Sequence, residues 1–138
     1  MEVMTRSAGV IVVRQFDDEL RCLLLRCYRY WDFPKGEVEL GEEPLTAAQR
    51  EVAEETGLTD LEFRWGEAWY ETPPYRQGKV ARYYLAQSPG GAVTLPVSPE
   101  LGRPEHHEYR WTSLDDAEDL LNDRVRGALS WARAQIYQ

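Results

Sequence analysis

The chain has 138 residues and a formal net charge of −8, with a pI near 4.8. This acidic balance argues against broad affinity for duplex nucleic acid, because such binding requires a basic surface. Binding of small anionic substrates is compatible with this charge, provided that lysines, arginines and a bound cation offset it locally. No apolar run approaches the roughly twenty residues that span a membrane, and the N-terminus lacks a secretory signal pattern. We therefore expect a cytoplasmic protein with one domain over residues 1–138.

The first part of the chain predicts a hairpin of core strands. Residues 8–15 and 20–27 are apolar runs separated by a polar, turn-like segment. Cys22 and Cys27 are the only cysteines, and they predict buried free thiols rather than a zinc site or a disulfide. The aromatic segment 28–33 that follows would either cover the core or line a pocket for a base.

A short acidic helix is expected between Pro44 and Gly57. Proline suits the first position of a helix, and glycine suits the residue just past its end. At about 100° per residue, Leu45, Ala48 and Val52 share one side of this helix. That side predicts the face that packs against a core.

Three acids crowd the neighbouring side of the same helix. Glu51, Glu54 and Glu55 are close enough in sequence for their carboxylates to repel each other. Arg50 lies four positions before Glu54, and its guanidinium suits a carboxylate held in a fixed orientation through two parallel hydrogen bonds. A divalent cation would also relieve the repulsion, since Mg²⁺ and Mn²⁺ prefer oxygen ligands and the carbonyls of loop 36–41 could complete the shell. Taken alone, three acids on a helix favour a solvated helix face.

Beyond the helix, the pattern predicts strands and a loop. Alternating apolar residues over 61–65 predict a half-buried strand, which residues 69–70 continue. Residues 73–78 predict a loop, and 80–87 a return strand. At the return strand, Lys79 and Tyr83 project to the same side and suit a phosphate and a base, or else a surface lysine and a core tyrosine.

Residues 88–104 predict a long loop, within which only 92–95 suits a short strand. A last strand is expected over 105–111. Its adjacent His106 and His107 would point to opposite sides of a strand, so they could not both bind one metal. We therefore do not expect a histidine metal site.

The C-terminal part predicts two helices. Ser113 followed by Asp116 indicates a capped helix start. A second helix would run to the C-terminus and cover one face of the sheet. Its apolar residues recur at helical spacing: Leu121, Val125, Ala128, Leu129, Ala132 and Ile136.

The stretch 36–58 resembles the Nudix box of the Nudix hydrolases. Its defining positions are Gly36, Glu42, Arg50, Glu51, Val52, Glu54, Glu55, Gly57 and Leu58. The Trp-Asp-Phe-Pro-Lys segment that leads into Gly36 is also typical of the family. The resemblance implies an α/β (α+β) fold in which a mixed β-sheet lies between α-helices. It also implies metal-dependent hydrolysis of a nucleoside diphosphate linked to another group.

Two further segments are similar to the asymmetrical diadenosine tetraphosphate hydrolases of this family. Residues 79–86 resemble their strand with a phosphate-binding lysine and a base-stacking tyrosine. Residues 105–111 resemble their segment with a glutamate that reaches the metals, which is Glu105 in this sequence. Glu37, where eukaryotic-type members often have histidine, and the proline-rich loop 88–104 depart from the pattern. The bacterial RNA pyrophosphohydrolases share much of it.

These resemblances imply a set of site residues. Two or three Mg²⁺ ions, with Mn²⁺ as an alternative, would be held by Gly36, Glu51, Glu54, Glu55 and Glu105. Glu54, oriented by Arg50, is the expected base, and Glu105 is the second candidate. The groups that would bind a small nucleotide substrate are Lys35, Lys79 and Tyr83.

The expected reaction is hydrolysis of diadenosine tetraphosphate to ATP and AMP. Cleavage at the 5' end of RNA, or of another nucleoside diphosphate-linked compound, is an alternative. A nucleotide-sensing module without catalysis is a further alternative, although degenerate members of the family typically lose the acids of the box.

Overall fold

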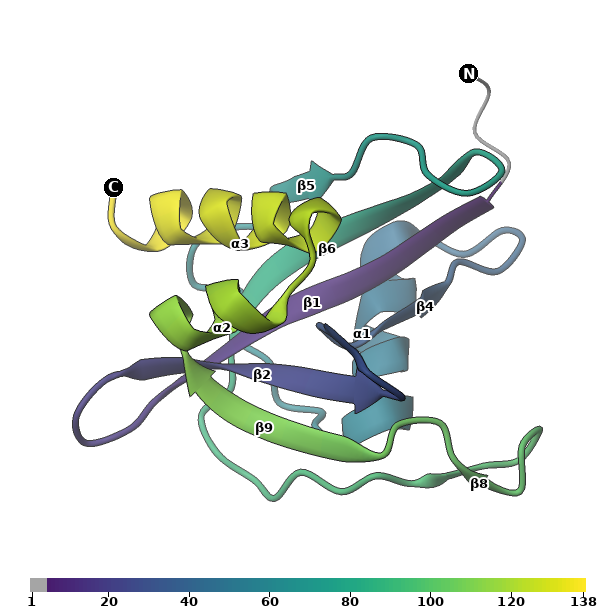
Figure 1. Ribbon diagram of the computed structural model, residues 1–138, viewed down its shortest axis with the longest axis horizontal. Coiled ribbons are helices and arrows are strands. Elements are labelled where there is room, and N and C mark those ends of the chain that lie inside the picture. The colour runs from purple at the N-terminus through teal and green to yellow at the C-terminus, as the bar shows by residue number, and fades with distance from the viewer. Residues whose placement is uncertain (1–4) are drawn as a thin grey trace.

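The computed structural model describes residues 5–138, which form a mixed sheet with helices on both faces (Figure 1). The strands are β1 (Thr5–Gln15), β2 (Leu20–Cys27), β3 (Tyr30–Asp32), β4 (Lys35–Glu37), β5 (Trp69–Glu71), β6 (Lys79–Gln87), β7 (Val97–Ser98), β8 (Arg103–Pro104) and β9 (Glu108–Ser113). The helices are α1 (Pro44–Thr56), α2 (Leu114–Leu120) and α3 (Asp123–Ile136). This architecture confirms the predicted fold class.

The sheet separates two apolar layers. In Figure 1, α1 lies behind the sheet, and α2 and α3 lie in front of it. Successive residues of β1 point to opposite faces, so Val10 and Val12 pack with α1, whereas Ile11 and Val13 pack with α2 and α3. No helix among residues 5–138 is long and apolar enough to span a membrane.

β1 is the central strand of the sheet. It pairs in parallel with β6, and its other edge is shared, in antiparallel pairing, between β2 and β4. Gly9 of β1 lies opposite Lys35 of β4, and a Cβ atom at position 9 would overlap the Pro34 carbonyl oxygen. The glycine therefore permits the close approach that places β4, with Gly36, beside α1.

The boundaries predicted for the acidic helix are confirmed. Pro44 begins α1, and Gly57 ends it in the left-handed conformation with φ of 80°, donating its N–H to the Ala53 carbonyl. Ala48 and Val52 are buried under the sheet, and Leu45 is half-buried against the same layer.

The predicted hairpin, the return strand and the two C-terminal helices are also confirmed as β1, β2, β6, α2 and α3. Ser113 caps α2 by accepting a hydrogen bond from the N–H of Asp116. Cys22 and Cys27 are free thiols, of which Cys22 is buried and Cys27 is half-buried.

Two strand predictions were wrong. Residues 61–65 form no strand and make only a single bridge, between Glu62 and Gln87, whereas the continuation expected at 69–70 is confirmed as β5. Phe63 packs with the α1 layer and Trp65 with the α3 layer, so this segment passes between layers instead of following a neighbouring strand. In the long loop, residues 92–95 form no strand, and Val93 and Leu95 pack on the α1 layer. The strands of this loop are instead β7 and β8, which pair with each other.

Candidate active site

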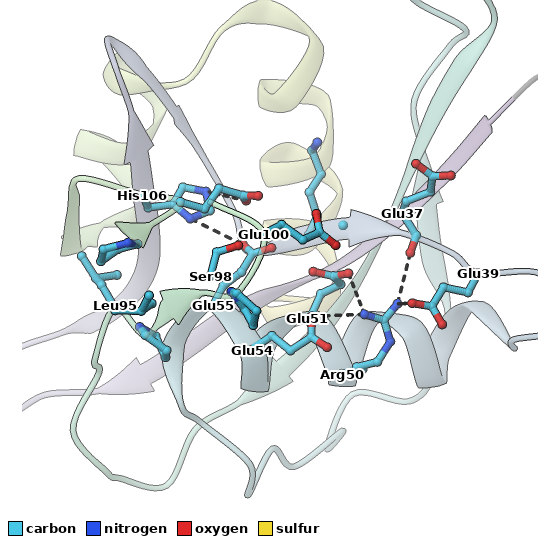
Figure 2. Close-up of a pocket in the computed structure, with 17 residues that line it drawn as sticks. Glu37, Glu39, Arg50, Glu51, Glu54, Glu55, Leu95, Ser98, Glu100 and His106 are labelled. Carbon is cyan, nitrogen blue, oxygen red and sulfur yellow. Dashed lines mark hydrogen bonds and ion pairs between the residues drawn. The ribbon is translucent and has the colours of Figure 1, made fainter. Parts of the chain in front are cut away.

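A cavity of about 780 Å³ lies between α1 and the segment that joins β6 to β9. One wall consists of β4 and the acidic face of α1, and the other of the β7–β8 hairpin and its flanking residues (Figure 2). All the residues that the sequence assigned to a metal line this cavity: Gly36, Glu51, Glu54, Glu55 and Glu105. The fold therefore brings together groups that are up to 69 positions apart in the sequence.

The three box acids of α1 differ in exposure. The Glu55 side chain is 8% exposed and that of Glu54 is 58% exposed, with Glu51 close to Glu55 in burial. Glu51 and Glu55 lie one helical turn apart, so both face the cavity floor, whereas Glu54 lies nearer the rim. The acids on this helix face therefore present two enclosed carboxylates and one accessible carboxylate.

Arg50 connects the loop before α1 to the acids on it. Its Nε and Nη2 donate to the two oxygens of Glu42 at 2.8 and 3.0 Å, and its Nη1 donates to Glu51 at 2.8 Å. Nη2 also donates to the carbonyl of Glu37 at 3.1 Å. The guanidinium therefore fixes both the loop and one cavity carboxylate.

Arg50 makes the expected pair of parallel bonds to a carboxylate, but the partner is not Glu54. Glu54 receives one bond of 3.2 Å from Arg50 Nη1, which also donates to Glu51. The bidentate partner is Glu42, and its hydrogen bonds from Arg50 lower the pKa of this carboxyl to about 2. The bidentate arrangement therefore holds the loop and leaves Glu54 less constrained.

Gly36 is essential to the shape of this site. A Cβ atom at position 36 would overlap the carboxylate of Glu51, so only glycine lets this acid lie against the β4 backbone. Gly36 is part of β4, paired with Ala8, rather than part of a free loop. The backbone of β4 and the Glu51 carboxylate thus form one side of the cavity floor.

Glu55 carries the strongest electrostatic strain among the acids. Burial raises the pKa of its carboxyl well above the ordinary value, and the nearby Glu105 and Glu51 raise it further. Burial also raises the pKa of Glu51. Within residues 5–138, Oε1 of Glu55 is buried and has no hydrogen-bond partner. An enclosed carboxylate oxygen without a donor, beside further carboxylates, fits a hard divalent cation such as Mg²⁺ or Mn²⁺.

The segment after β8 brings a histidine into the same cluster. His106 lies with Nδ1 3.8 Å from Glu55 Oε1 and Nε2 3.8 Å from Glu105 Oε2 (Figure 2). The sequence argument against a histidine metal site placed both histidines on a strand, and that placement was wrong. The last strand begins at Glu108, so His106 is on the turn that enters the cavity, while His107 packs against Tyr28. Burial lowers the pKa of His106 to about 4, which leaves the imidazole neutral near pH 7.

The residues predicted to bind substrate fall in different places. Lys35 lines the cavity, and its Nζ lies 3.7 Å from Asp32. Lys79, at the start of β6, is not among the cavity-lining residues of the described part of the chain. Tyr83 needs a correction, because its ring is fully buried in the α3 layer and its hydroxyl donates to Asp32. In this position the ring has no free face for an adenine, and the alternative of a core tyrosine fits the structure.

Comparison with known proteins agrees with this geometry. A family model described as the NUDIX domain matches residues 4–132. The chain belongs to the Nudix family of hydrolases.

Its relatives within this Nudix family act on different named substrates. The asymmetrical bis(5'-nucleosyl)-tetraphosphatase of Caenorhabditis elegans is 29% identical over 133 residues, and the alignment covers 92% of each chain. An RNA pyrophosphohydrolase of Caulobacter vibrioides is 37% identical over 109 residues, covering 70% of this chain and 63% of that protein. The structure of a C. elegans Ap4A hydrolase binary complex matches with a TM-score of 0.75 at 25% identity, covering 96% of this chain and 97% of that one.

The burial of Glu55 predicts an effect on stability. Because its pKa is raised in the folded state, the folded protein holds the Glu55 proton more tightly than the unfolded chain does. Glu55 therefore costs no stability below the ordinary pKa of a glutamate, and its cost grows as pH rises from there to the folded-state pKa. At pH 8 in a chelator, Glu55→Gln should raise Tm by about 3–5 °C, the shift that about 1 kcal/mol gives for a domain of this size. The gain should shrink toward pH 5, because the glutamate of the unfolded chain then begins to take up its proton as well.

Glu54→Gln is the matched control, since that side chain is largely exposed and should change Tm much less. Addition of Mg²⁺ or Mn²⁺ at pH 8 should stabilise the wild type more than Glu55→Gln. A lower Tm for Glu55→Gln in the chelator would contradict this account of the buried carboxylate.

Proposed function

We propose that this Nudix hydrolase cleaves a phosphoanhydride bond of a nucleoside polyphosphate with the help of Mg²⁺ and that diadenosine tetraphosphate, cleaved to ATP and AMP, is its preferred substrate. The observation that carries the proposal is the group of box carboxylates that line one cavity, among which Glu55 has a buried oxygen without a hydrogen-bond partner in residues 5–138. The similarity to the C. elegans tetraphosphatase over 92% of both chains supports the choice of substrate. The full set of acids argues against a sensor without catalysis. The cytoplasmic location and the 1–138 domain extent stay predictions.

The proposed metal ligands are the Gly36 carbonyl and the carboxylates of Glu51, Glu55 and Glu105. Bound Mg²⁺ would neutralise charge on the phosphates and lower the pKa of a water molecule. Two or three ions fit the number of oxygen donors around the cavity. The lack of a Cβ atom at Gly36 and the single bond from Arg50 to Glu51 leave the carboxylate of Glu51 in place to contribute.

Glu54 is the proposed base that takes the proton from the attacking water. Its carboxylate is accessible from the cavity rim, and the single Arg50 bond of 3.2 Å orients it without enclosing it or constraining it tightly. Glu105 is the second candidate. Lys35, beside the cavity, would bind an outlying phosphate. Lys79 would need to reach its phosphate from outside the lining, so its role is the less supported of the two.

The hairpin opposite α1 would contact the nucleoside. Leu95, Pro96 and Val97 give the cavity an apolar wall facing the carboxylates. Val97 is exposed, although it is an apolar residue, and a nucleobase face would cover it. This segment, which departs from the related hydrolases in sequence, would then help to select the substrate.

The second candidate function is removal of pyrophosphate from the 5' end of RNA. The specific observation in its favour is the 37% identity with the C. vibrioides RNA pyrophosphohydrolase, although that match covers only 70% of this chain. Triphosphorylated RNA and diadenosine tetraphosphate carry the same kind of bond. The two substrates differ in the group attached on the far side of the polyphosphate, which is an RNA chain in one and a second adenosine in the other.

Product analysis tests the function directly. Purified protein incubated with diadenosine tetraphosphate and Mg²⁺ should release ATP and AMP in equal amounts, as separated by ion-exchange chromatography, and a chelator should abolish the reaction. Two molecules of ADP would show symmetric cleavage and contradict the proposal. If the compound is not cleaved while triphosphorylated RNA is, the second candidate replaces the first.

Replacement of Glu54 by Gln should reduce kcat by orders of magnitude while substrate still binds, because the amide cannot accept the proton. Binding can be followed by titration calorimetry with the same substrate and metal. Glu43→Gln is the control, since Glu43 is exposed and lies outside the cavity lining of the described residues. Unchanged kcat in Glu54→Gln would transfer the role of base to Glu105.

Replacement of Val97 by Asp should raise KM about tenfold, as a loss of about 1.4 kcal/mol would, with little change in kcat. The aspartate carboxylate would repel the anionic substrate, and the substitution would also remove the apolar contact of Val97. Leu101→Asp is the matched control, because Leu101 lies on the same hairpin, is similarly exposed and does not line the cavity. Equal KM values for the two variants would exclude the proposed wall.

A further inference from the structure

We propose that His106 is itself a ligand of the metal centre and gives it a nitrogen donor, an inference that rests on the metal-dependent function proposed above. The sequence argument set both histidines aside, because neighbours on a strand point to opposite sides. Both histidines precede β9, so the strand rule does not apply to them. His106 lies in the cavity beside Glu55 (Figure 2), with Glu105 also 3.8 Å away. His107 packs against Tyr28.

The spacing of the donor atoms suits a shared cation. One ligand atom from each of Glu55, Glu105 and His106 lies within 4.8 Å of the other two. Around a six-coordinate cation with bonds of about 2.1–2.3 Å, adjacent ligand atoms are about 3 Å apart and opposite ones about 4.4 Å. Three donors of one ion include at most one opposite pair, so the other separations would close from at most 4.8 Å to about 3 Å. Side-chain movements of up to about 1.8 Å would therefore place all three donors on one ion.

The surroundings of the two enclosed side chains point to an atom between them. The Glu55 side chain is 8% exposed and that of His106 is 13% exposed, yet the closest approach of 3.8 Å between Nδ1 and Oε1 is too long for a hydrogen bond. Oε1 of Glu55 is buried and accepts no hydrogen bond from residues 5–138. A cation bound to both atoms would satisfy the orphaned oxygen and the imidazole together.

The His106 backbone is also held in position. The N–H of the next residue, His107, donates to the Arg26 carbonyl at 2.8 Å, which attaches the turn to the end of β2. The imidazole therefore enters the cavity from a fixed point on the sheet. Such preorganisation is typical of a side chain that binds a ligand.

A nitrogen donor changes which metal the site prefers. Mg²⁺ favours oxygen ligands in a near-ideal octahedron, whereas Mn²⁺ and later transition metals accept imidazole and bind mixed nitrogen and oxygen sites more tightly. His106 should therefore bias this centre toward Mn²⁺ over Mg²⁺. The bias should be lost when the imidazole is removed, even if the carboxylates still bind a cation.

Pulsed electron paramagnetic resonance of bound Mn²⁺ tests the assignment without relying on activity. The full chain, free of any histidine tag, is loaded with one equivalent of Mn²⁺, and the echo is examined for modulation by a directly bound nitrogen. The wild type and His107→Gln should show this coupling, and His106→Gln should lack it. In calorimetry, His106→Gln should weaken Mn²⁺ binding by about 10–100-fold and Mg²⁺ binding by less.

The measurement on the wild type alone can overturn the proposal, so it does not depend on how well the variant folds. Absence of nitrogen coupling in the wild type, or its persistence in His106→Gln, would show that the imidazole does not bind the metal. Nitrogen coupling with no hydrolysis of any polyphosphate would refute the proposed function only. Hydrolysis without nitrogen coupling would refute the role of His106 only.

Discussion

The structure of this site depends on the repulsion between carboxylates that the fold places within one cavity. Arg50 is the principal protein counter-charge: it holds Glu42 through two bonds, contacts Glu51 and Glu54, and ties the preceding loop to α1. It does not reach Glu55, whose buried oxygen stays without a partner among residues 5–138. A protein cation thus fixes the rim and the loop, and the deeper carboxylate is left for a cation from solution.

The fold makes this arrangement possible through close approaches of the backbone. Gly9 lets β4 pair tightly with β1, and Gly36 lets Glu51 lie against β4. Packing of Val52 under the sheet fixes the rotation of α1, so that the acidic side of the helix faces the cavity. The segment from β6 to β9 then closes the other side and delivers Glu105 and His106.

The sequence predicted well what local signals determine, and less well what depends on contacts distant in the chain. Pro44 and Gly57 set the ends of α1 because their backbone preferences act within the helix itself. The alternating pattern around Phe63 predicted a strand that does not form. Such a pattern shows that every second residue is buried, but it does not show whether these residues pack in one layer or in two. The sequence did not decide between a substrate-binding and a core role for Tyr83, for the same reason. A strand pattern predicts the face of the sheet on which a side chain lies, but it does not predict which helix covers that face. His106 was missed because its direction depends on where β9 begins. His106 would have stayed a candidate ligand if the residues before β9 had also been considered in a non-strand conformation.

The central claim is that the unpartnered Glu55 carboxylate is a cation ligand. Anomalous diffraction from a crystal of the protein soaked in Mn²⁺ tests it most directly, because the signal locates the metal without reference to activity. The account predicts a peak within about 2.5 Å of a Glu55 carboxylate oxygen, with Gly36, Glu105 and His106 around it. Peaks confined to other surfaces, with none in this cavity at saturating Mn²⁺, would contradict it.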